Sequence, residues 1–470
     1  MAQTDMSRQL AQAPVPRLLL RLSLPAIAAQ LVNALYSIVD RVFIGNMPGV
    51  GADALTGLGF TMPVIMIISA FSMLIGMGGS PLLSIRLGEG DEAAAARLQG
   101  CSFTLLLAIG GALTGLFWFL RVPILTLFGA EANTLPYAAD YLGVYVLGSV
   151  FVMISLGMNA FLNAQGRTGV GTVTVVLGAA VNLILDPIFI YVLDLGIAGA
   201  ALATLISQAL SALWVLWFLF FSKRLMVRLR PDHLRVSWKT TVEICKLGVS
   251  TFIFEINESV VQIVINLLLR RWGGSTAVSD LYIGSMTIIN SLLAVFFMPL
   301  KGIVRGAQPI IGYCCGARDY PRLRETVRWA RVFSITCATL MWACFELFPG
   351  PLCAIFNDDP ALTDLSARLT RLFFCTIFLL GLQMVNQHSF IAMGNAKLSF
   401  FFGILRKILL LLPLSFLLPL FLGVDGVILA EPVANVFTVI ITQIVFTRYL
   451  EQLRREFTAP HPGETASPRI

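Results

Sequence analysis

The amino-acid sequence predicts an all-α membrane protein, with about twelve transmembrane helices arranged in two pseudo-symmetric six-helix bundles. Hydrophobic residues make up 57% of the 470 residues and charged residues only 13%, roughly half the charged fraction of a soluble domain. The apolar runs are about 17 to 26 residues long, which is the length a helix needs to cross a bilayer core. Backbone groups in lipid must be paired within their own segment, and the runs lack the alternation of barrel strands, so helices are favoured.

The apolar runs fall into two sets of six, separated by the longest polar stretch inside the chain. The first set covers residues 22–40, 60–83, 103–120, 141–162, 170–192 and 197–221. The second set covers residues 244–269, 282–303, 332–348, 372–393, 400–421 and 427–446. We therefore expect an N-terminal bundle at 1–221, a basic linker at 222–241, a C-terminal bundle at 242–450 and a tail at 451–470.

The net charge of +7 is carried by alternate loops, and the central linker holds the largest share. Its basic residues are Lys223, Arg224, Arg228, Arg230, Arg235 and Lys239. By the positive-inside rule, this pattern predicts a multi-pass protein of the plasma membrane with both termini in the cytoplasm. The charge is then a signal of orientation, and a nucleic-acid partner is not expected. No small-residue cleavage site precedes the first span, so we expect no removable signal peptide.

Short motifs recur at a spacing of about 228 residues, which indicates an internal repeat. The motif that ends at Asp91 resembles the one that ends at Asp319, and residues 164–166 resemble 392–394. Residues 196–199 and 423–426 form a further pair. Because each half holds six spans, both halves have the same orientation, and their symmetry axis runs along the membrane normal. This arrangement places a substrate near the bilayer midplane between the bundles.

Two repeat-related spans carry polar side chains along one helix face. These residues are Gln30, Asn33 and Ser37 in the first span and Glu255, Glu258 and Gln262 in the seventh. Polar groups are costly in lipid, so both stripes should face an interior cavity and bind substrate. The alternative is that they form hydrogen bonds between neighbouring helices, which is common in membrane bundles. The acidic residues favour the substrate interpretation.

The fifth span carries Asn182 and Asp186 one helical turn apart on the same face. A charged carboxylate at that depth is costly, which suits it to exchanging a proton or a metal cation. Asp40, in the outer part of the first span, either joins this chemistry or caps a helix end beside Arg41.

Two further ionisable residues have open interpretations. Glu431 in the last span is followed by Pro432, so it is either a second-site acid or part of a structural kink. His388 in the tenth span either relays protons or is simply hydrogen-bonded.

The motifs that the chain lacks restrict its function. There is no phosphate-binding loop for ATP, and no metalloprotease or hydrolase motif occurs. We therefore expect a transporter, not an enzyme, with no cofactor, driven by an ion gradient that is worth roughly 2.3 kcal/mol per charge per 100 mV. A lipid-linked oligosaccharide flippase is one rival, but it predicts a basic cleft. A membrane-embedded enzyme such as a prenyltransferase is another, but it predicts aspartate-rich metal motifs.

Three segments resemble the multidrug and toxic compound extrusion (MATE) family. They are Tyr36-Ser-Ile-Val-Asp40-Arg-Val-Phe-Ile-Gly45, Asn182-Leu-Ile-Leu-Asp186-Pro-Ile-Phe-Ile190 and Gly196-Ile-Ala-Gly-Ala-Ala201. Within this family the chain is most similar to the bacterial MepA-like multidrug exporters. The resemblance implies two six-helix bundles around a V-shaped cleft, which export cationic amphiphiles in exchange for H⁺ or Na⁺.

The resemblance also assigns roles to residues. It implies that Asp40, Asn182, Asp186 and Thr204 couple transport to the ion, and that they ligate the metal if the ion is Na⁺. It further implies that Glu255 supplies an acid on the seventh helix, while the tenth-helix acid of some relatives is missing here. We accordingly expect a monomeric antiporter in the lipid bilayer, with Glu255 and Glu258 attracting the positive charge of the substrate.

Overall fold

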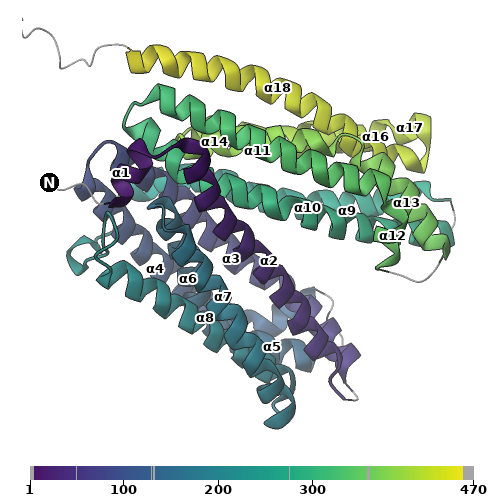
Figure 1. Ribbon diagram of the computed structural model, residues 1–470. Coiled ribbons are helices and arrows are strands. Elements are labelled where there is room, and N and C mark those ends of the chain that lie inside the picture. Colours follow the sequence, from purple (N-terminus) through teal and green to yellow (C-terminus); the bar gives the residue numbers. More distant parts are fainter. Residues whose placement is uncertain are drawn as a thin grey trace, which may run out of the picture. The chain divides into compact units, whose positions relative to one another are not determined.

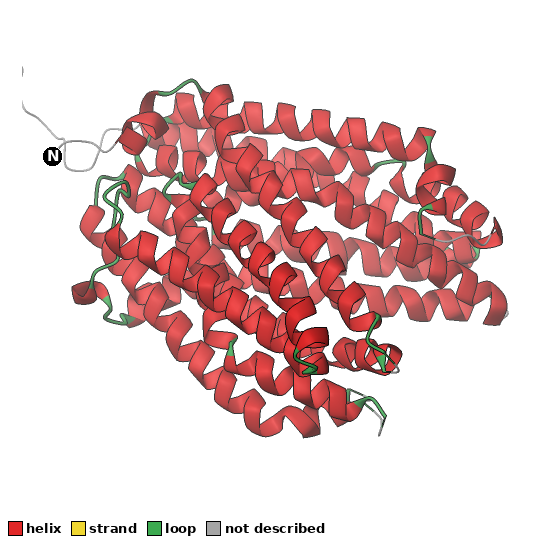
Figure 2. Ribbon diagram, turned by 60° about the horizontal axis from the view of Figure 1, so that its bottom comes forward, coloured by secondary structure: helices red, strands yellow, loops and turns green. Residues whose placement is uncertain are grey.

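The computed structural model describes residues 5–48, 50–128, 130, 133–274, 276–356 and 360–458, and every secondary-structure element in them is a helix (Figure 2). The side chains at 5, 6, 37, 38, 52, 254–260, 262, 263, 276, 277 and 280 lie outside this description. Packing divides the chain into two compact units. Unit 1 comprises Met1–Ala13, Leu20–Leu87 and Asp91–Phe252, and unit 2 comprises Pro14–Leu19, Gly88–Gly90 and Ile253–Ile470.

Unit 1 is a bundle of long helices (Figure 1). Its elements are α1 (Asp5–Gln12), α2 (Val15–Gly45), α3 (Gly51–Gly88), α4 (Glu92–Leu127), α5 (Leu135–Leu147), α6 (Ser149–Ala164), α7 (Thr168–Pro187), the π-helical η1 (Ile188–Val192), α8 (Gly196–Phe221) and the 3-10 helix η2 (Pro231–His233). Helix α8 packs against α5, α6, α7 and η1. Its buried Gly199, Ala200 and Ala203 are small, so neighbouring backbones approach it closely.

Unit 2 begins within α9 (Trp238–Trp272), the first part of which belongs to unit 1. Its further elements are α10 (Thr276–Gly316), α11 (Tyr320–Leu347), α12 (Pro349–Ala354), α13 (Pro360–Phe374), the 3-10 helix η3 (Ile377–Leu379), α14 (Leu380–Ala392), α15 (Ala396–Ile404), the π-helical η4 (Leu405–Leu411), α16 (Leu412–Leu417), α17 (Pro419–Leu422) and α18 (Val424–Thr458). Helix α10 packs on α11, α13 and α14, while α18 packs on α13, α14, α16 and η4.

The number of membrane spans agrees with the sequence prediction. Within the described residues, nine helices are long and apolar enough to cross a membrane, and two bent helix pairs raise the number to eleven. The bends measure 56° between α5 and α6 and 45° between α13 and the segment Ile377–Ala392. The remaining predicted span, 244–269, falls within α9, part of whose side chains lie outside the description. The predicted all-α membrane fold is confirmed.

The predicted repeat is visible in the structure, because the same local backbone features recur about 228 residues apart. Asp91 accepts a hydrogen bond from the backbone N–H of Ala94 (2.8 Å), and Asp319 accepts one from that of Arg322 (3.1 Å). Left-handed backbone recurs in the pairs Gly90 and Arg318, Gly166 and Gly394, and Gly196 and Gly423. Helices of the two units therefore begin and end through the same capping and turn chemistry.

The basic linker 222–241 is folded against unit 1. Leu225, Val227 and Leu229 are buried, with at most 5% of their surface exposed. The backbone N–H of Val227 donates to Oε1 of Gln165 (3.0 Å), and Nε2 of Gln165 donates to Oε1 of Gln99 (3.1 Å). A buried glutamine side chain thus ties the linker to the ends of α4 and α6.

Candidate ion-coupling site

Asn182 and Asp186 lie one turn apart on α7, with 1% and 0% of their surface exposed. Nδ2 of Asn182 donates a hydrogen bond to Oδ1 of Asp186 (3.1 Å) and another to Oγ1 of Thr204 on α8 (3.3 Å). One amide group therefore joins the fifth and sixth spans. The structure brings these three predicted residues into direct contact.

Asp40 approaches the same cluster from α2. This helix continues to Gly45, so Asp40 lies within the helix and does not cap its end. The side chain of Asp40 is buried, whereas that of the adjacent Arg41 is exposed. The carboxylates of Asp40 and Asp186 are close enough for their charges to repel each other. Two acids from different helices thus share one desolvated region of unit 1.

Three oxygen atoms in this cluster are buried and receive no hydrogen bond from any described residue. They are Oδ1 of Asp40, Oδ1 of Asn182 and Oδ2 of Asp186. Leaving a buried acceptor without a donor costs about 1–3 kcal/mol, so three together form an unusual group. No described lysine or arginine lies within salt-bridge distance of either carboxylate. Carboxylate and amide oxygens suit a proton or a hard cation such as Na⁺.

Two tyrosine hydroxyls contact the cluster at Thr204, and sequence reasoning did not identify them. Those of Tyr36 and Tyr141 approach Thr204, and the ring of Tyr141 stacks on that of Tyr145 with centroids 6.0 Å apart. Tyr36 precedes Asp40 by one helical turn, so both lie on the same face of α2. That spacing was the available signal, but a neutral tyrosine in an apolar span is common and carries little weight alone.

The backbone after Asp186 departs from α-helical geometry. The π-helical turn η1 begins two residues later, and π turns are frequently found at functional sites. The hydroxyl of Tyr191 in η1 donates to the carbonyl oxygen of Phe43 on α2 (2.6 Å). A Cβ atom at Gly199 would lie 2.7 Å from the carbonyl oxygen of Phe189, so only glycine lets α8 approach η1 this closely. These contacts hold α2, η1 and α8 together around the cluster.

The predicted substrate residues are only partly described. On α2, Gln30 is half-buried and Asn33 is exposed. The remaining predicted residues lie outside the described side chains: Ser37, Glu255, Glu258 and Gln262. Their role in substrate binding stays a prediction.

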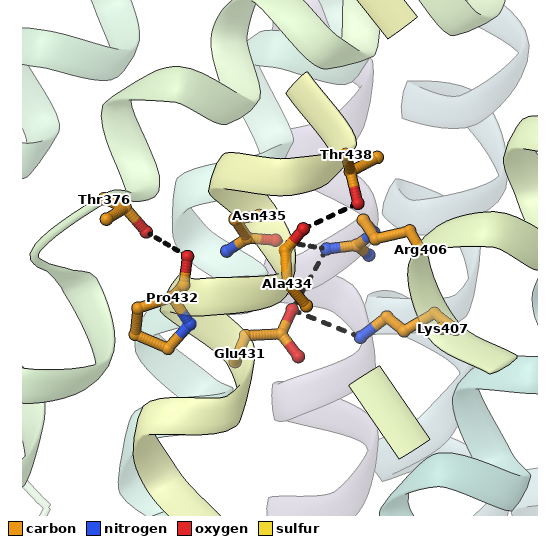
Figure 3. Close-up of polar contacts among 8 residues, drawn as sticks. All are labelled: Thr376, Arg406, Lys407, Glu431, Pro432, Ala434, Asn435 and Thr438. Carbon is orange, nitrogen blue, oxygen red and sulfur yellow. Dashed lines mark hydrogen bonds and ion pairs between the residues drawn. The ribbon is translucent and has the colours of Figure 1, made fainter. Parts of the chain in front are cut away.

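Unit 2 contains two ionisable residues whose roles the sequence left open. Glu431 is buried and forms ion pairs with Arg406 and Lys407 (Figure 3). Nδ1 of His388 lies 2.9 Å from the carbonyl oxygen of Met384, so this histidine is hydrogen-bonded to its own helix. Among the described side chains, no group of three or more histidines, cysteines, aspartates or glutamates is placed to hold a metal ion.

Known proteins resemble this chain over nearly its whole length. The FAD transporter of Shewanella oneidensis is 26% identical over 95% of this chain and 97% of its own. The multidrug export protein MepA of Staphylococcus haemolyticus is 24% identical over 89% of this chain and 90% of its own. These relatives are transporters and not enzymes.

Solved structures share the fold. An outward-facing multidrug resistance MATE family transporter of the MOP superfamily superposes with a TM-score of 0.88, at 22% identity, over 96% of this chain and 100% of that one. A MOP superfamily transporter from Pyrococcus furiosus also has a TM-score of 0.88, at 21% identity, over 96% and 99%. The family model MatE matches residues 25–188 and 251–417, more than half of the sequence. The chain therefore belongs to the MATE family of membrane transporters.

Proposed function

We propose that this protein is a secondary-active exporter that exchanges H⁺ or Na⁺ for cationic amphiphilic compounds by alternating access. The observation that carries the proposal is the group of buried oxygen atoms on Asp40, Asn182 and Asp186 that lack hydrogen-bond donors. A cation is the ligand that satisfies such a group, because each oxygen presents a lone pair and the carboxylates are negatively charged. The name of the MepA relatives, multidrug export proteins, supports the class of substrate.

Asn182 orients the acid that receives the cation. Its Nδ2 atom is engaged by Oδ1 of Asp186 and by Thr204, which leaves Oδ2 of Asp186 and Oδ1 of Asn182 for the ion. Asp40 supplies a second carboxylate from α2. Two carboxylates in one desolvated site repel each other, so binding a single positive charge stabilises both.

Binding of the cation would then change the packing of unit 1. When both carboxylates are charged and unpaired, α2 and α7 are pushed apart, and when a cation binds they are drawn together. The π-helical η1 begins two residues after Asp186, so it is the backbone segment on which such a change acts first. In this scheme the arrival of the ion favours release of the exported compound.

The substrate residues proposed from the sequence are Gln30, Asn33, Ser37, Glu255, Glu258 and Gln262. The two glutamates would attract the positive charge of the substrate, and the amides would orient it by hydrogen bonds. Flexible methionine side chains tolerate apolar groups of different shape, which suits a multidrug exporter.

We further propose that the protein acts as a monomer in the plasma membrane with both termini in the cytoplasm. The basic residues of the linker 222–241 support this orientation, because positively charged loops are retained on the cytoplasmic side. Cysteine labelling from either side of the membrane, at an introduced position in this linker, tests the orientation directly.

The coupling role is tested with Asp186→Asn in cells and in proteoliposomes. We expect the variant to reach the membrane at the normal level and to lose ion-driven export of a cationic dye such as ethidium. The matched control is Asp140→Asn, which makes the same change at an exposed position of α5 in the same unit. Export at the normal rate by Asp186→Asn would remove Asp186 from the coupling mechanism.

The driving ion is identified by imposing one gradient at a time. Proteoliposomes that contain the purified protein are given either a pH gradient or a sodium gradient, with the other ion equal on both sides. The gradient that drives dye movement in the native protein, but not in Asp186→Asn, identifies the coupled ion. Dye movement that needs neither gradient would contradict secondary-active exchange.

A further inference from the structure

An exposed apolar and basic surface, where the linker passes into α9, has no role in the proposed export mechanism. Of the described large hydrophobic residues, Trp238 is the most exposed, at 82%, and Val236 is 53% exposed. The charged side chains of Arg235 and Lys239 flank these two residues and are also exposed. Neither charge is paired with a described carboxylate. We call these four residues the Trp238 surface.

Contacts with α4 on both sides hold the Trp238 surface in place on unit 1. Before it, the carbonyl oxygen of Leu234 accepts a hydrogen bond from Oγ1 of Thr104 (2.8 Å). After it, Oγ1 of Thr241 lies 3.7 Å from Sγ of Cys101. These two residues of α4 lie at the start of the predicted membrane span 103–120. The Trp238 surface is therefore fixed where α4 enters the membrane.

The first part of the linker carries the same combination of residues at the same end of unit 1. Phe221, the last residue of α8, is 70% exposed, and Lys223 and Arg224 follow it with exposed side chains. The preceding Phe220 contacts Phe103 on α4, with ring centroids 6.4 Å apart, so the end of α8 lies beside the start of the third span. Two exposed aromatic residues, each next to basic residues, thus mark one membrane boundary.

Aromatic and basic side chains together are suited to the surface of a bilayer. Tryptophan is enriched where hydrocarbon meets headgroups, because its ring is apolar and its N–H group is polar. Basic residues near the membrane are attracted to anionic headgroups. In the linker 222–241, six basic residues outnumber the single acidic residue, Asp232. The positive-inside rule needs only that number of charges, whereas a lipid site also needs the charges held beside exposed apolar side chains, as they are here.

We propose that the Trp238 surface binds anionic phospholipids of the adjacent leaflet. The indole ring of Trp238 lies among the headgroups, and Arg235 and Lys239 contact the lipid phosphates. A zwitterionic headgroup offers the same phosphate but carries its own cation, so lipids with a net negative charge are preferred. Such binding holds the start of α9 at the membrane surface. It concerns the lipid and not the exported compound, so it does not depend on the proposed ion coupling.

The test uses the fluorescence that Trp238 contributes, taken as the difference between the native full-length protein and Trp238→Leu in the same nanodiscs. The nanodiscs contain equal amounts of phosphatidylcholine and phosphatidylglycerol, one of which is brominated and quenches nearby tryptophan. We expect brominated phosphatidylglycerol to quench more strongly at low salt. At 1 M salt, where the Debye length is about 3 Å, the difference should disappear. Both leaflets have the same composition, so the result is independent of the proposed orientation.

Removing the charges separates lipid recognition from mere exposure of the ring. Arg235→Gln and Lys239→Gln should each lower the preference for phosphatidylglycerol by up to about fivefold, and in the double variant both lipids should quench equally. The melting temperature should not change, because both side chains are exposed. The control, Arg271→Gln, removes an exposed charge at the opposite end of α9 and should leave the preference unchanged. Equal quenching of Trp238 by both lipids at low salt would overturn the proposal, and so would quenching by neither, which is expected if Trp238 contacts water or another protein.

Discussion

Replacing Asn182 with alanine should weaken the binding of the coupling ion far more than replacing Thr204 with valine. Asn182→Ala removes Oδ1, a predicted ligand of the ion, together with the Nδ2 donor that holds Oδ1 of Asp186 at 3.1 Å. Interactions with charged groups contribute about 1.5–3 kcal/mol, which corresponds to roughly a 10- to 150-fold higher half-saturating ion concentration. Thr204→Val keeps the side-chain shape, and the hydrogen bond from Asn182 that it removes joins neutral groups and is worth about 1 kcal/mol or roughly fivefold. The tyrosine hydroxyls that also approach Thr204 are neutral as well.

The assay is dye export by proteoliposomes at graded concentrations of the driving ion, at a fixed amount of folded protein. The control is Ser211→Ala on α8, which removes the hydrogen bond from Oγ of Ser211 to the carbonyl oxygen of Thr174 on α7 (3.1 Å) and touches no member of the cluster. It should leave the half-saturating concentration unchanged. The reasoning is refuted if Thr204→Val has the larger effect, or if Asn182→Ala stays within twofold of the native protein.

Three further predictions concern packing in unit 1. Thr172→Val removes the hydrogen bond from Oγ1 of Thr172 to the carbonyl oxygen of Pro25 (2.6 Å), so the free energy of unfolding should fall by about 1 kcal/mol. Thermal melting measures this fall, and the control is Thr174→Val, whose hydroxyl donates within α7. Gly248→Ala should reduce the yield of monodisperse protein in size-exclusion chromatography, since its Cβ would overlap the carbonyl oxygen of Leu74. Gly59→Ala, with nothing within 4 Å of its Cβ, should be tolerated. Gln165→Leu should make trypsin cleave the linker after Arg228 roughly tenfold faster, because the linker loses its buried acceptor. Unchanged cleavage would mean that other contacts hold the linker.

Hydropathy and spacing were sufficient for the fold and for part of the site. Apolar runs of membrane-spanning length predict the helices, and the helical period predicts that Asn182 and Asp186 share a face. The contact with Thr204 came from the resemblance alone, because no local pattern pairs residues on different helices. The position of Asp40 within α2 resolves an alternative that hydropathy left open, since helix ends are the least certain feature of a sequence-based assignment.

The features that sequence analysis did not predict depend on three-dimensional packing. Hydropathy averaged over a whole span conceals Arg406 and Lys407, because the surrounding leucines dominate the window. Their pairing with Glu431 needs the π-helical η4, and π turns have no recognisable sequence pattern. The linker was expected to be merely polar, yet Leu225, Val227 and Leu229 stand at every second position, alternate with Met226 and Arg228, and are buried. That alternation was present in the sequence, but the basic residues of this segment were interpreted only as a signal of membrane orientation.

The contrast between the units leads to a last prediction about which of them couples transport to the ion. A carboxylate exchanges a mobile cation only if no fixed cation already neutralises it, and Glu431 faces two fixed cations at 3.0 and 3.4 Å. Glu431→Gln should therefore leave the half-saturating ion concentration of dye export unchanged, per molecule of folded protein, even where it lowers the melting temperature. Asp186→Asn should lose ion dependence entirely. A shift in ion dependence for Glu431→Gln similar to that for Asn182→Ala would mean that both units carry coupling sites, and the assignment of coupling to unit 1 alone would have to be abandoned.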